Sequence, residues 1–354
     1  MTGKTQMVSH VALLLIVSIG PIFASAPTHV ATTNFAERLF RLSSRGGGQA
    51  RVGASVDHPW IRTSNSSSLC PISAFGSQIA PDNPPNKEPK TNVVEQNVQR
   101  ELAAFEQLSV NRSATLAADE YGTSTWEENL SCCWWMLKVV GAKGYDLAKG
   151  KDPAALFTLR KSVWEDPYFK NLRGYFQRSL QWNEKPNGKD ELEPCVLAEE
   201  LLKLVVANAR AVCTTPHACR PGNVYHDFNV KKATGVVLDE AGAMHAADAL
   251  HIWGWGCRPC VMSGDPKQLP PRMMTHGLSR GGKCMNMFSL HGRLSVLERL
   301  EKVGGPSFEL NTQYRIVSGS FDLARLLIYP DLHEFRYGEM ASLERHPLAT
   351  KVET

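Results

Sequence analysis

Between residues 211 and 265 the sequence contains three short apolar segments, and each of them ends in polar residues. The segments and the residues that follow them are Ala211–Cys213 with Thr214 and Thr215, Gly235–Leu238 with Asp239 and Glu240, and Pro259–Met262 with Gly264 and Asp265. Short apolar strands are typical of a parallel sheet, because both of its faces are covered. Ligands bind beyond the carboxyl ends of such strands. The pattern therefore predicts an α/β fold with its functional residues at the strand ends.

The first 44 residues predict more α/β structure. Apolar residues 7–19 predict a helix, residues 21–26 a strand, and residues 30–42 a second helix with apolar positions at helical spacing. The apolar run at residues 11–20 and the small residues Ala24, Ser25 and Ala26 also have the outline of a secretory signal peptide with its cleavage site. Two interpretations therefore compete for this segment, a buried helix and a secretion signal.

Composition limits the class of protein. Hydrophobic residues make up 43% and charged residues 21% of the 354 residues, as in globular chains, which excludes a wholly disordered, collagen-like or polytopic membrane protein. The length predicts about two domains. The net charge of +4 means that any nucleic acid would bind at a local groove. Nine scattered cysteines favour a reducing compartment, so we expect an intracellular protein, in cytoplasm or nucleus, without a membrane partner.

The middle of the chain predicts an insertion. Residues 43 to about 89 are rich in Gly, Ser and Pro, which predicts a surface segment without regular structure. Residues 93–108 and 191–209 predict amphipathic helices. Between these helices lie Trp126, Trp134, Trp135, Trp164 and Trp182. Nucleic-acid bases can stack on such rings, but we favour a role in the core of an inserted subdomain.

The acidic pair after the second apolar segment is a candidate metal and catalytic site. In this arrangement Asp239 would orient the waters of a Mg²⁺ beside a nucleoside triphosphate, and Glu240 would activate the attacking water. Taken alone, an Asp-Glu pair at a strand end is also a common exposed helix cap. The motifs that follow it decide between the two interpretations.

Three motifs follow one another along the chain: DEAG at residues 239–242, GDPKQLPP at residues 264–271 and QYR at residues 313–315. This series resembles superfamily 1 helicases of the nonsense-mediated-decay (regulator of nonsense transcripts) type. The resemblance implies a P-loop NTPase with RecA-like domains that uses ATP and Mg²⁺. It implies that Gln268 couples the γ-phosphate to movement between domains and that Arg315 stabilises charge in the cleft.

The same resemblance extends to nucleic-acid contacts. Residues 26–31 resemble the motif in which Pro27 and Thr28 touch the nucleic-acid backbone, and Thr214 and Thr215 belong to a further strand-end element. Backbone contacts position a strand without reading its sequence. The implied partner is therefore single-stranded RNA or DNA, with protein partners expected through the insertion.

A phosphate-binding loop has the pattern G-x-x-x-x-G-K-[ST], and residues 2–5 supply its last part. The resemblance implies that Gly3 and Lys4 contact the phosphates and that Thr5 joins Asp239 on Mg²⁺. It covers residues 1 to about 42 and about 193 to 338, so we expect a helicase core truncated at both ends, or an incomplete gene model. In this setting the apolar run of residues 11–20 is the buried helix behind the phosphate loop, and secretion is the less favoured interpretation.

The expected organisation has four parts. Residues 1–42 begin a first RecA-like domain, residues 43–190 form the insertion, residues 191–305 complete the first domain and residues 306–354 begin a second one. The start of this second unit is placed by an expected helix at residues 294–302, the Gly304-Gly305-Pro306 break and an expected strand at residues 307–310.

Two functions remain open at this stage. The first is an ATP-dependent helicase or translocase core fragment in which Mg·ATP hydrolysis is coupled to single-strand binding, with turnover impaired by the truncation. The second is a non-catalytic nucleic-acid or protein binding module on the same scaffold. Cys257 and Cys260 form a single C-x-x-C, for which we favour free thiols over a metal site.

Overall fold

The structure, a computed structural model, describes residues 3–45, 60–62, 130–142, 144–149, 152–178, 194–254, 256–332 and 334–342. The chain divides into two compact units. The first consists of Met1–Ser18, Ala24–Arg45 and Gly235–Thr354, and the second of Ile19–Phe23 and Gly46–Thr234. The expected helix at residues 93–108, Trp126 and Trp182 lie outside the described residues.

The central element is a sheet of five strands in the order β2-β3-β1-β4-β5. The strands are β1 (Ile22–Ser25), β2 (Trp60–Arg62), β3 (Ala211–Thr214), β4 (Gly235–Leu238) and β5 (Cys260–Met262). The pairs β2–β3 and β4–β5 are parallel, and Val236 lies opposite Cys260 in the second pair. Every residue of β1, β3 and β4 is buried. The predicted α/β fold with a parallel sheet is confirmed.

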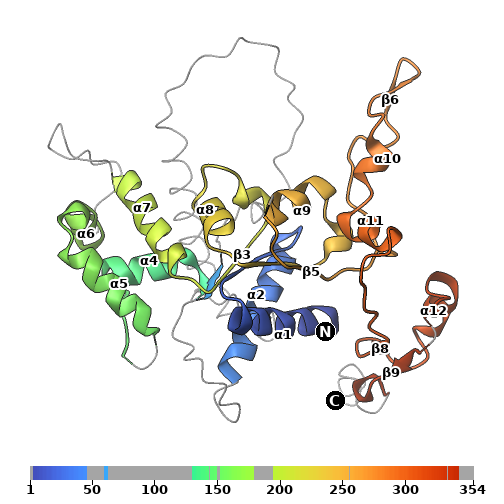
Figure 1. The fold of residues 1–354 in the computed structure, drawn as a ribbon, viewed down its shortest axis with the longest axis horizontal. Coiled ribbons are helices and arrows are strands. Elements are labelled where there is room, and N and C mark those ends of the chain that lie inside the picture. The colour runs from blue at the N-terminus through green and yellow to red at the C-terminus, as the bar shows by residue number, and fades with distance from the viewer. Residues whose placement is uncertain are drawn as a thin grey trace, which may run out of the picture. The chain divides into compact units, whose positions relative to one another are not determined.

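Helices α1 (Gly3–Ser18) and α2 (His29–Arg45) pack against each other in the first unit (Figure 1). The buried residues of α1 are Val8, Ser9, Ala12 and Ile16, whose spacing follows the helical repeat. Leu14 and Val17 on the same helix are 65% and 51% exposed. The helix expected behind the phosphate loop is therefore present, but it is buried on one side only. Ala24, Ser25 and Ala26 are buried, as expected for the end of a core strand.

Among the described residues, no helix has both the length and the apolar character needed to cross a membrane.

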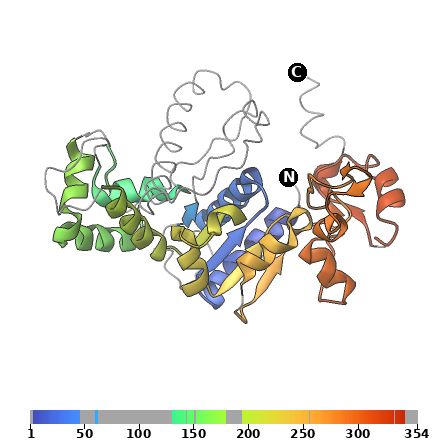
Figure 2. The ribbon, with the colours of Figure 1, turned by 90° about the horizontal axis from the view of Figure 1, so that it is seen from above.

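The second unit contains a cluster of four helices, drawn in green shades in Figures 1 and 2. They are α4 (Cys132–Val140), α5 (Ala154–Glu165), α6 (Lys170–Arg178) and α7 (Pro194–Ala207). Trp135 is buried in this cluster, and Trp134 is half-buried. Trp164 is 41% exposed and donates its indole N–H to the Val139 carbonyl over 3.3 Å. The core interpretation is thus confirmed for Trp135 and wrong for Trp164, which lies at the edge of the cluster.

Strand β2 lies inside the segment that was predicted to lack regular structure. Its backbone pairs in parallel with β3, and Trp60 lies opposite Ala211. The hydrogen-bonding groups for this strand come from β3, which is more than 140 residues further along the chain. Composition of the segment itself does not reveal such a distant partner.

The expected strand at residues 307–310 does not form. These residues lack regular structure, and Phe308 is 90% exposed. The short strand of this region is β8 (Thr312–Gln313), which pairs in parallel with β9 (Arg336–Tyr337). The apolar residues of this segment have no covering layer in the described part of the chain, so burial does not favour a strand there.

The remaining elements follow the sheet strands in sequence. They are α8 (Val224–Lys231), α9 (Ala246–Trp253), β6 (Ser279–Arg280), β7 (Lys283–Cys284), α10 (Ser289–Gly292), α11 (Val296–Lys302) and α12 (Asp322–Ile328). Helix α11 corresponds to the helix expected at residues 294–302. It starts after Ser295, whose hydroxyl accepts a hydrogen bond from the Glu298 N–H over 3.1 Å, as an N-cap does.

Two glycines allow the loops after β4 and β5 to touch. The Ala241 N–H donates to the Ser263 carbonyl over 2.7 Å. A Cβ atom at Gly264 would lie 2.5 Å from the Gly242 nitrogen, and one at Gly242 would lie 2.7 Å from the Asp265 carbonyl oxygen. Only glycine permits backbones to approach this closely.

Gly264→Ala is therefore expected to lower the free energy of unfolding by about 1–3 kcal/mol, because backbone atoms must shift to admit the methyl group. Urea unfolding of the purified chain measures the change. Gly256→Ala is the matched control, because a Cβ atom there meets nothing within 4 Å. Equal stability of the two variants would contradict the packing of these loops.

Candidate functional site

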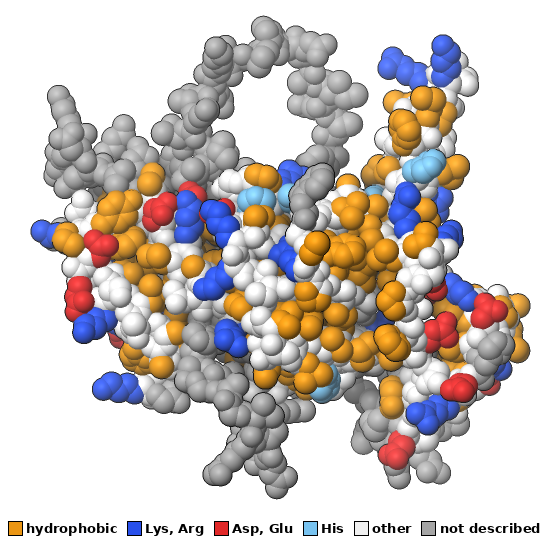
Figure 3. Space-filling view, viewed as in Figure 1, with side chains coloured by type: hydrophobic (Ala, Val, Ile, Leu, Met, Phe, Trp, Pro, Cys, Tyr) orange, Lys and Arg blue, Asp and Glu red, His pale blue; other side chains and the backbone are white. Residues whose placement is uncertain are grey.

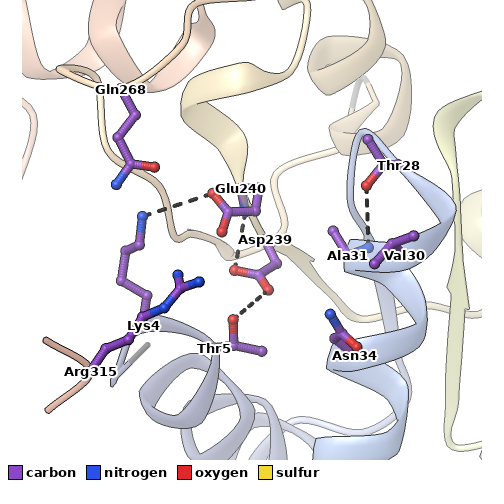
Figure 4. A pocket seen from close by; sticks show the side chains of 10 residues that line it. All are labelled: Lys4, Thr5, Thr28, Val30, Ala31, Asn34, Asp239, Glu240, Gln268 and Arg315. Atoms are coloured by element: carbon purple, nitrogen blue, oxygen red, sulfur yellow. Dashed lines mark hydrogen bonds and ion pairs between the residues drawn. The ribbon is translucent and has the colours of Figure 1, made fainter. Parts of the chain in front are cut away.

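A cavity of about 300 Å³ lies in the first unit at the start of α1 and the carboxyl end of β4 (Figure 4). It is lined by Lys4, Thr5, Thr28, Val30, Ala31, Asn34, Asp239, Glu240, Gln268 and Arg315. Six of these residues were named from the sequence for the nucleotide and metal, and Thr28 was named for nucleic acid. The fold thus brings together residues that are more than 300 positions apart in the chain.

Asp239 is the buried acidic group of the cavity, with 3% of its surface exposed. It accepts hydrogen bonds from the Thr5 hydroxyl and from the Glu240 N–H, both over 3.1 Å. Burial raises the pKa of Asp239, and the neighbouring charge of Glu240 raises it further. The hydrogen bonds that it accepts from Glu240, Thr5 and Ser263 act in the opposite direction. A buried carboxylate in this state favours a cation beside it.

The backbone of Glu240 is in the left-handed region that glycine usually occupies, with φ of 51° and ψ of 37°. This left-handed conformation is costly for a residue with a side chain and is often found at functional sites. It places the carboxylate in the cavity, where the Lys4 ammonium lies 3.8 Å from it. The side chain makes no capping hydrogen bond to the short helix that follows. The alternative that Asp239 and Glu240 form an exposed helix cap is therefore wrong.

Gln268 is held by Asp265, which organises the GDPKQLPP loop. The Gln268 amide donates to Asp265 Oδ2 over 2.9 Å, and the Lys267 N–H donates to Oδ1 over 3.0 Å. The Tyr329 hydroxyl donates to the same Oδ2 atom over 2.8 Å. Burial and the Asp265 carboxylate raise the pKa of Tyr329 to about 12. Tyr329, which does not line the cavity, thus supports the GDPKQLPP loop through Asp265, and the sequence did not reveal this contact.

Arg315 reaches the cavity from the QYR segment. The Gln313 side chain fixes this turn by accepting a hydrogen bond from the Arg315 N–H over 2.8 Å. The Tyr314 ring comes close to the start of α1, since a Cβ atom at Gly3 would lie 3.8 Å from its Cδ2 atom. Gln313 therefore fixes the backbone at Arg315, and Tyr314 lies beside the start of α1.

The first turns of α2 form another wall of the cavity. The Thr28 hydroxyl accepts a hydrogen bond from the Ala31 N–H over 3.2 Å and so caps the helix. Val30, Ala31 and Asn34 line the cavity but were not named from the sequence as site residues. Their spacing of three and four residues, which places side chains on one helix face, is the signal that could have identified them.

Other residues named from the sequence lie elsewhere. Gly3 begins α1, and neither Gly3 nor Pro27 belongs to the residues that line the cavity. Thr214 and Thr215 belong to the second unit, and their side chains are 0% and 5% exposed. Their expected contact with nucleic acid would therefore need the backbone or a local rearrangement, and it stays a prediction.

The donor atoms of the cavity suit Mg²⁺ and phosphate. Mg²⁺ prefers oxygen ligands, and the Thr5 hydroxyl and the Asp239 carboxylate supply two of them 3.1 Å apart. Phosphates prefer a helix N-terminus and cationic side chains. The start of α1, Lys4 and Arg315 provide these groups at the same cavity. The residues present therefore fit both groups.

The C-x-x-C segment shows no comparable set of ligand atoms. Both thiols are free, with Cys257 exposed and Cys260 half-buried. Burial raises the pKa of the Cys260 thiol to about 12, against the opposing charge of Arg258. Metal binding requires the thiolate, so burial disfavours Cys260 as a ligand.

Comparison with known proteins identifies a family for this chain. Residues 1–276 match the protein family described as AAA domain. The chain belongs to the AAA domain family. This match is consistent with a helicase-like P-loop protein, and it does not distinguish the nonsense-mediated-decay type within that group. A search of the curated proteins found no match to this AAA domain chain.

The raised pKa of Asp239 predicts a pH dependence of stability. A raised pKa means that the folded state binds the proton more tightly than the unfolded state does. The free energy of unfolding should therefore fall as pH rises through the interval between the two pKa values, and it should stay lower above that interval. Asp239→Asn is expected to abolish this loss and to stabilise the metal-free chain at pH 7.

Chemical unfolding at a series of pH values measures the effect. Asp227→Asn is the control, because that carboxylate is exposed and pairs with Lys231 over 2.9 Å. An Asp239→Asn variant that is less stable than the original chain at pH 7 would contradict the assignment of a costly buried charge.

The hydrogen bond between Tyr329 and Asp265 predicts energetic coupling. A double-mutant cycle with Tyr329→Phe and Asp265→Asn should give an interaction energy of about 0.5–3 kcal/mol in urea unfolding. The control cycle pairs Asp265→Asn with Tyr337→Phe, since the Tyr337 hydroxyl donates to Asp322. Additive effects in both cycles would show that the Tyr329 contact contributes nothing.

Proposed function

We propose that the chain is the ATP-binding core of a superfamily 1 helicase or translocase of the nonsense-mediated-decay type. In this proposal it hydrolyses Mg·ATP in the cavity and couples this reaction to the binding of single-stranded RNA or DNA. The family match supports a helicase-like nucleotide-binding domain. The finer assignment is supported by the motif series at residues 239–242, 264–271 and 313–315.

The observation that carries the proposal is the hydrogen bond between Thr5 and Asp239. It joins the residue after the phosphate-loop lysine to the acidic residue at the end of β4 over 3.1 Å. P-loop NTPases use a hydroxyl and an acidic side chain at these two positions to hold Mg²⁺. The two residues are 234 positions apart in the chain, so the fold and not local sequence brings them together, as a shared metal site requires.

Each polar side chain of the cavity has a role in this proposal. Lys4 pairs with phosphate oxygens, and Thr5 and Asp239 hold the metal. Bound Mg²⁺ would neutralise the charge that develops on the phosphate oxygens. Glu240, whose side chain is 36% exposed, accepts the proton of the attacking water. Gln268 and Arg315 contact the terminal phosphate, and Arg315 stabilises the charge of the transition state.

The remaining assignments are extensions of the same proposal. Pro27, Thr28, Thr214 and Thr215 would contact the nucleic-acid backbone, and the residues between 43 and 190 would form an insertion that binds protein partners. Residues 1–42 and 191–305 would together make one RecA-like domain, and residues 306–354 would begin a second. The reducing environment that nine cysteines favour supports a place in the cytoplasm or nucleus.

The ion pair between Lys4 and Glu240 favours a second candidate, a nucleotide-dependent binding module without turnover. The Lys4 ammonium and the Glu240 carboxylate lie 3.8 Å apart, so each partly neutralises the charge of the other. Nucleotide binding has to compete with this contact, and while the contact persists the Glu240 carboxylate faces Lys4 instead of an attacking water. The two candidates differ in hydrolysis and agree on nucleotide binding.

Glu240→Gln tests them. If the chain is an ATPase, phosphate release in the presence of Mg²⁺ and a poly(U) strand should fall about 10²- to 10⁴-fold in this variant. Binding of a fluorescent ATP analogue should persist in Glu240→Gln and be lost in Lys4→Ala. Glu301→Gln on the exposed side of α11 is the control.

Binding of the analogue without phosphate release in the original chain would support the binding module. Absence of nucleotide binding at any concentration tested would reject both candidates.

A further inference from the structure

Residues 272–293, which we call the arm, project from the first unit between the GDPKQLPP loop and α11 (Figure 1). Strands β6 and β7 form an antiparallel hairpin at its tip, and α10 lies at its base. The tip turns through Gly281 and Gly282, whose φ angles of 57° and 73° suit a tight two-residue turn. The arm lines no part of the cavity described above.

The arm belongs to a stretch of uniform charge. Residues 266–297 contain five Lys or Arg residues and no Asp or Glu, whereas the whole chain has a net charge of only +4. In the described part of the chain, no ion pair with an acidic group involves Arg272, Arg280, Lys283 or Arg293. Basic side chains gather visibly at the tip of the arm in Figure 3. These charges are therefore available to an anionic partner.

The hairpin register places two of these charges side by side. Arg280 lies directly opposite Lys283, and both side chains are exposed. Like charges at opposing positions of a strand pair destabilise the pair. A phosphate bound between the two side chains would remove this repulsion.

Exposed apolar side chains accompany the charges. Met274, Met287, Phe288 and Leu290 are 70–81% exposed. The arm keeps its shape through polar contacts and does not bury these side chains. The Asn286 side-chain amide donates to the Thr275 hydroxyl over 2.8 Å, and the Phe288 N–H donates to the side-chain oxygen Oδ1 of Asn286 over 2.9 Å. Phe288 is thus presented to the solvent on a fixed turn.

We infer that the arm is a binding site for single-stranded nucleic acid, in which Arg280 and Lys283 hold phosphates and Phe288 stacks on a base. Single-strand binding commonly combines cationic side chains with aromatic platforms. An apolar protein partner would cover the methionines, but it would leave a run of unpaired positive charge at the contact, so the charge favours a nucleic acid. The inference rests on the proposed function for its class of partner and adds a contact surface outside the cavity.

Fluorescence anisotropy of a labelled uridine 20-mer with the full chain, in the absence of nucleotide, tests the arm. Phe288→Ala should weaken binding roughly 5- to 100-fold, and Phe288→Trp should restore it, since stacking tolerates any aromatic ring. In the double variant Arg280→Gln, Lys283→Gln, the slope of log K against log salt should become less steep by about 1.4. Each phosphate contact on a single strand contributes about 0.7 to the magnitude of this slope.

Lys302→Gln is the matched control, because the Lys302 ammonium already pairs with Glu298 over 2.7 Å. Its affinity and salt slope should equal those of the original chain. Circular dichroism should show the same helix content in every variant, since the altered side chains are exposed.

Unchanged binding in the Phe288 and tip variants would overturn the arm as a nucleic-acid site and leave the proposed function intact. Failure of the original chain to bind the strand, with binding of the ATP analogue retained, would overturn the arm and the nucleic-acid half of the proposed function together. A loss of self-association in Phe288→Ala, seen by sedimentation while strand binding stays the same, would assign the arm to contact with a second copy.

Discussion

The contact between the loops that follow β4 and β5 is the constraint on which the site depends. Strands of a fully buried parallel sheet carry apolar side chains on both faces, so hydrophobic alternation does not specify their register. The hydrogen bond from the Ala241 N–H to the Ser263 carbonyl, over 2.7 Å, supplies that specification. Because the glycines of the two loops touch, the backbone segments that carry Glu240 and Gln268 are held next to each other at the cavity.

The cavity concentrates local costs that the rest of the fold has to offset. Asp239 carries a buried charge, and Glu240 carries a left-handed backbone. Natural sequences violate local rules mainly where binding or catalysis requires it. The buried strands and the face that α1 shares with α2 supply the compensating burial. A cation beside Asp239 would relieve the cost of its buried charge.

Local sequence patterns predicted the parts of the fold that depend on local physics. Apolar runs that end in polar residues predicted the positions of β3, β4 and β5. The order of the motifs predicted most of the polar residues that line the cavity. Interactions between distant segments were less predictable. Strand β2 forms because its backbone pairs with β3. Tyr329 contacts the GDPKQLPP loop through the Asp265 carboxylate, 64 positions away in the chain. The exposed side of α1 depends on which faces are covered, and composition does not contain that information.

Asp265 Oδ2 accepts hydrogen bonds from both Gln268 and Tyr329, and this sharing has a consequence for movement. If the Gln268 amide turns toward a ligand in the cavity, the carboxylate oxygen keeps its second donor. The departure then exchanges one hydrogen bond for another and leaves no unpaired acceptor, whose cost would be larger. Tyr329 therefore lowers the free-energy cost of moving the Gln268 side chain away from Asp265. A side chain that changes position when a ligand fills the cavity requires such a low cost.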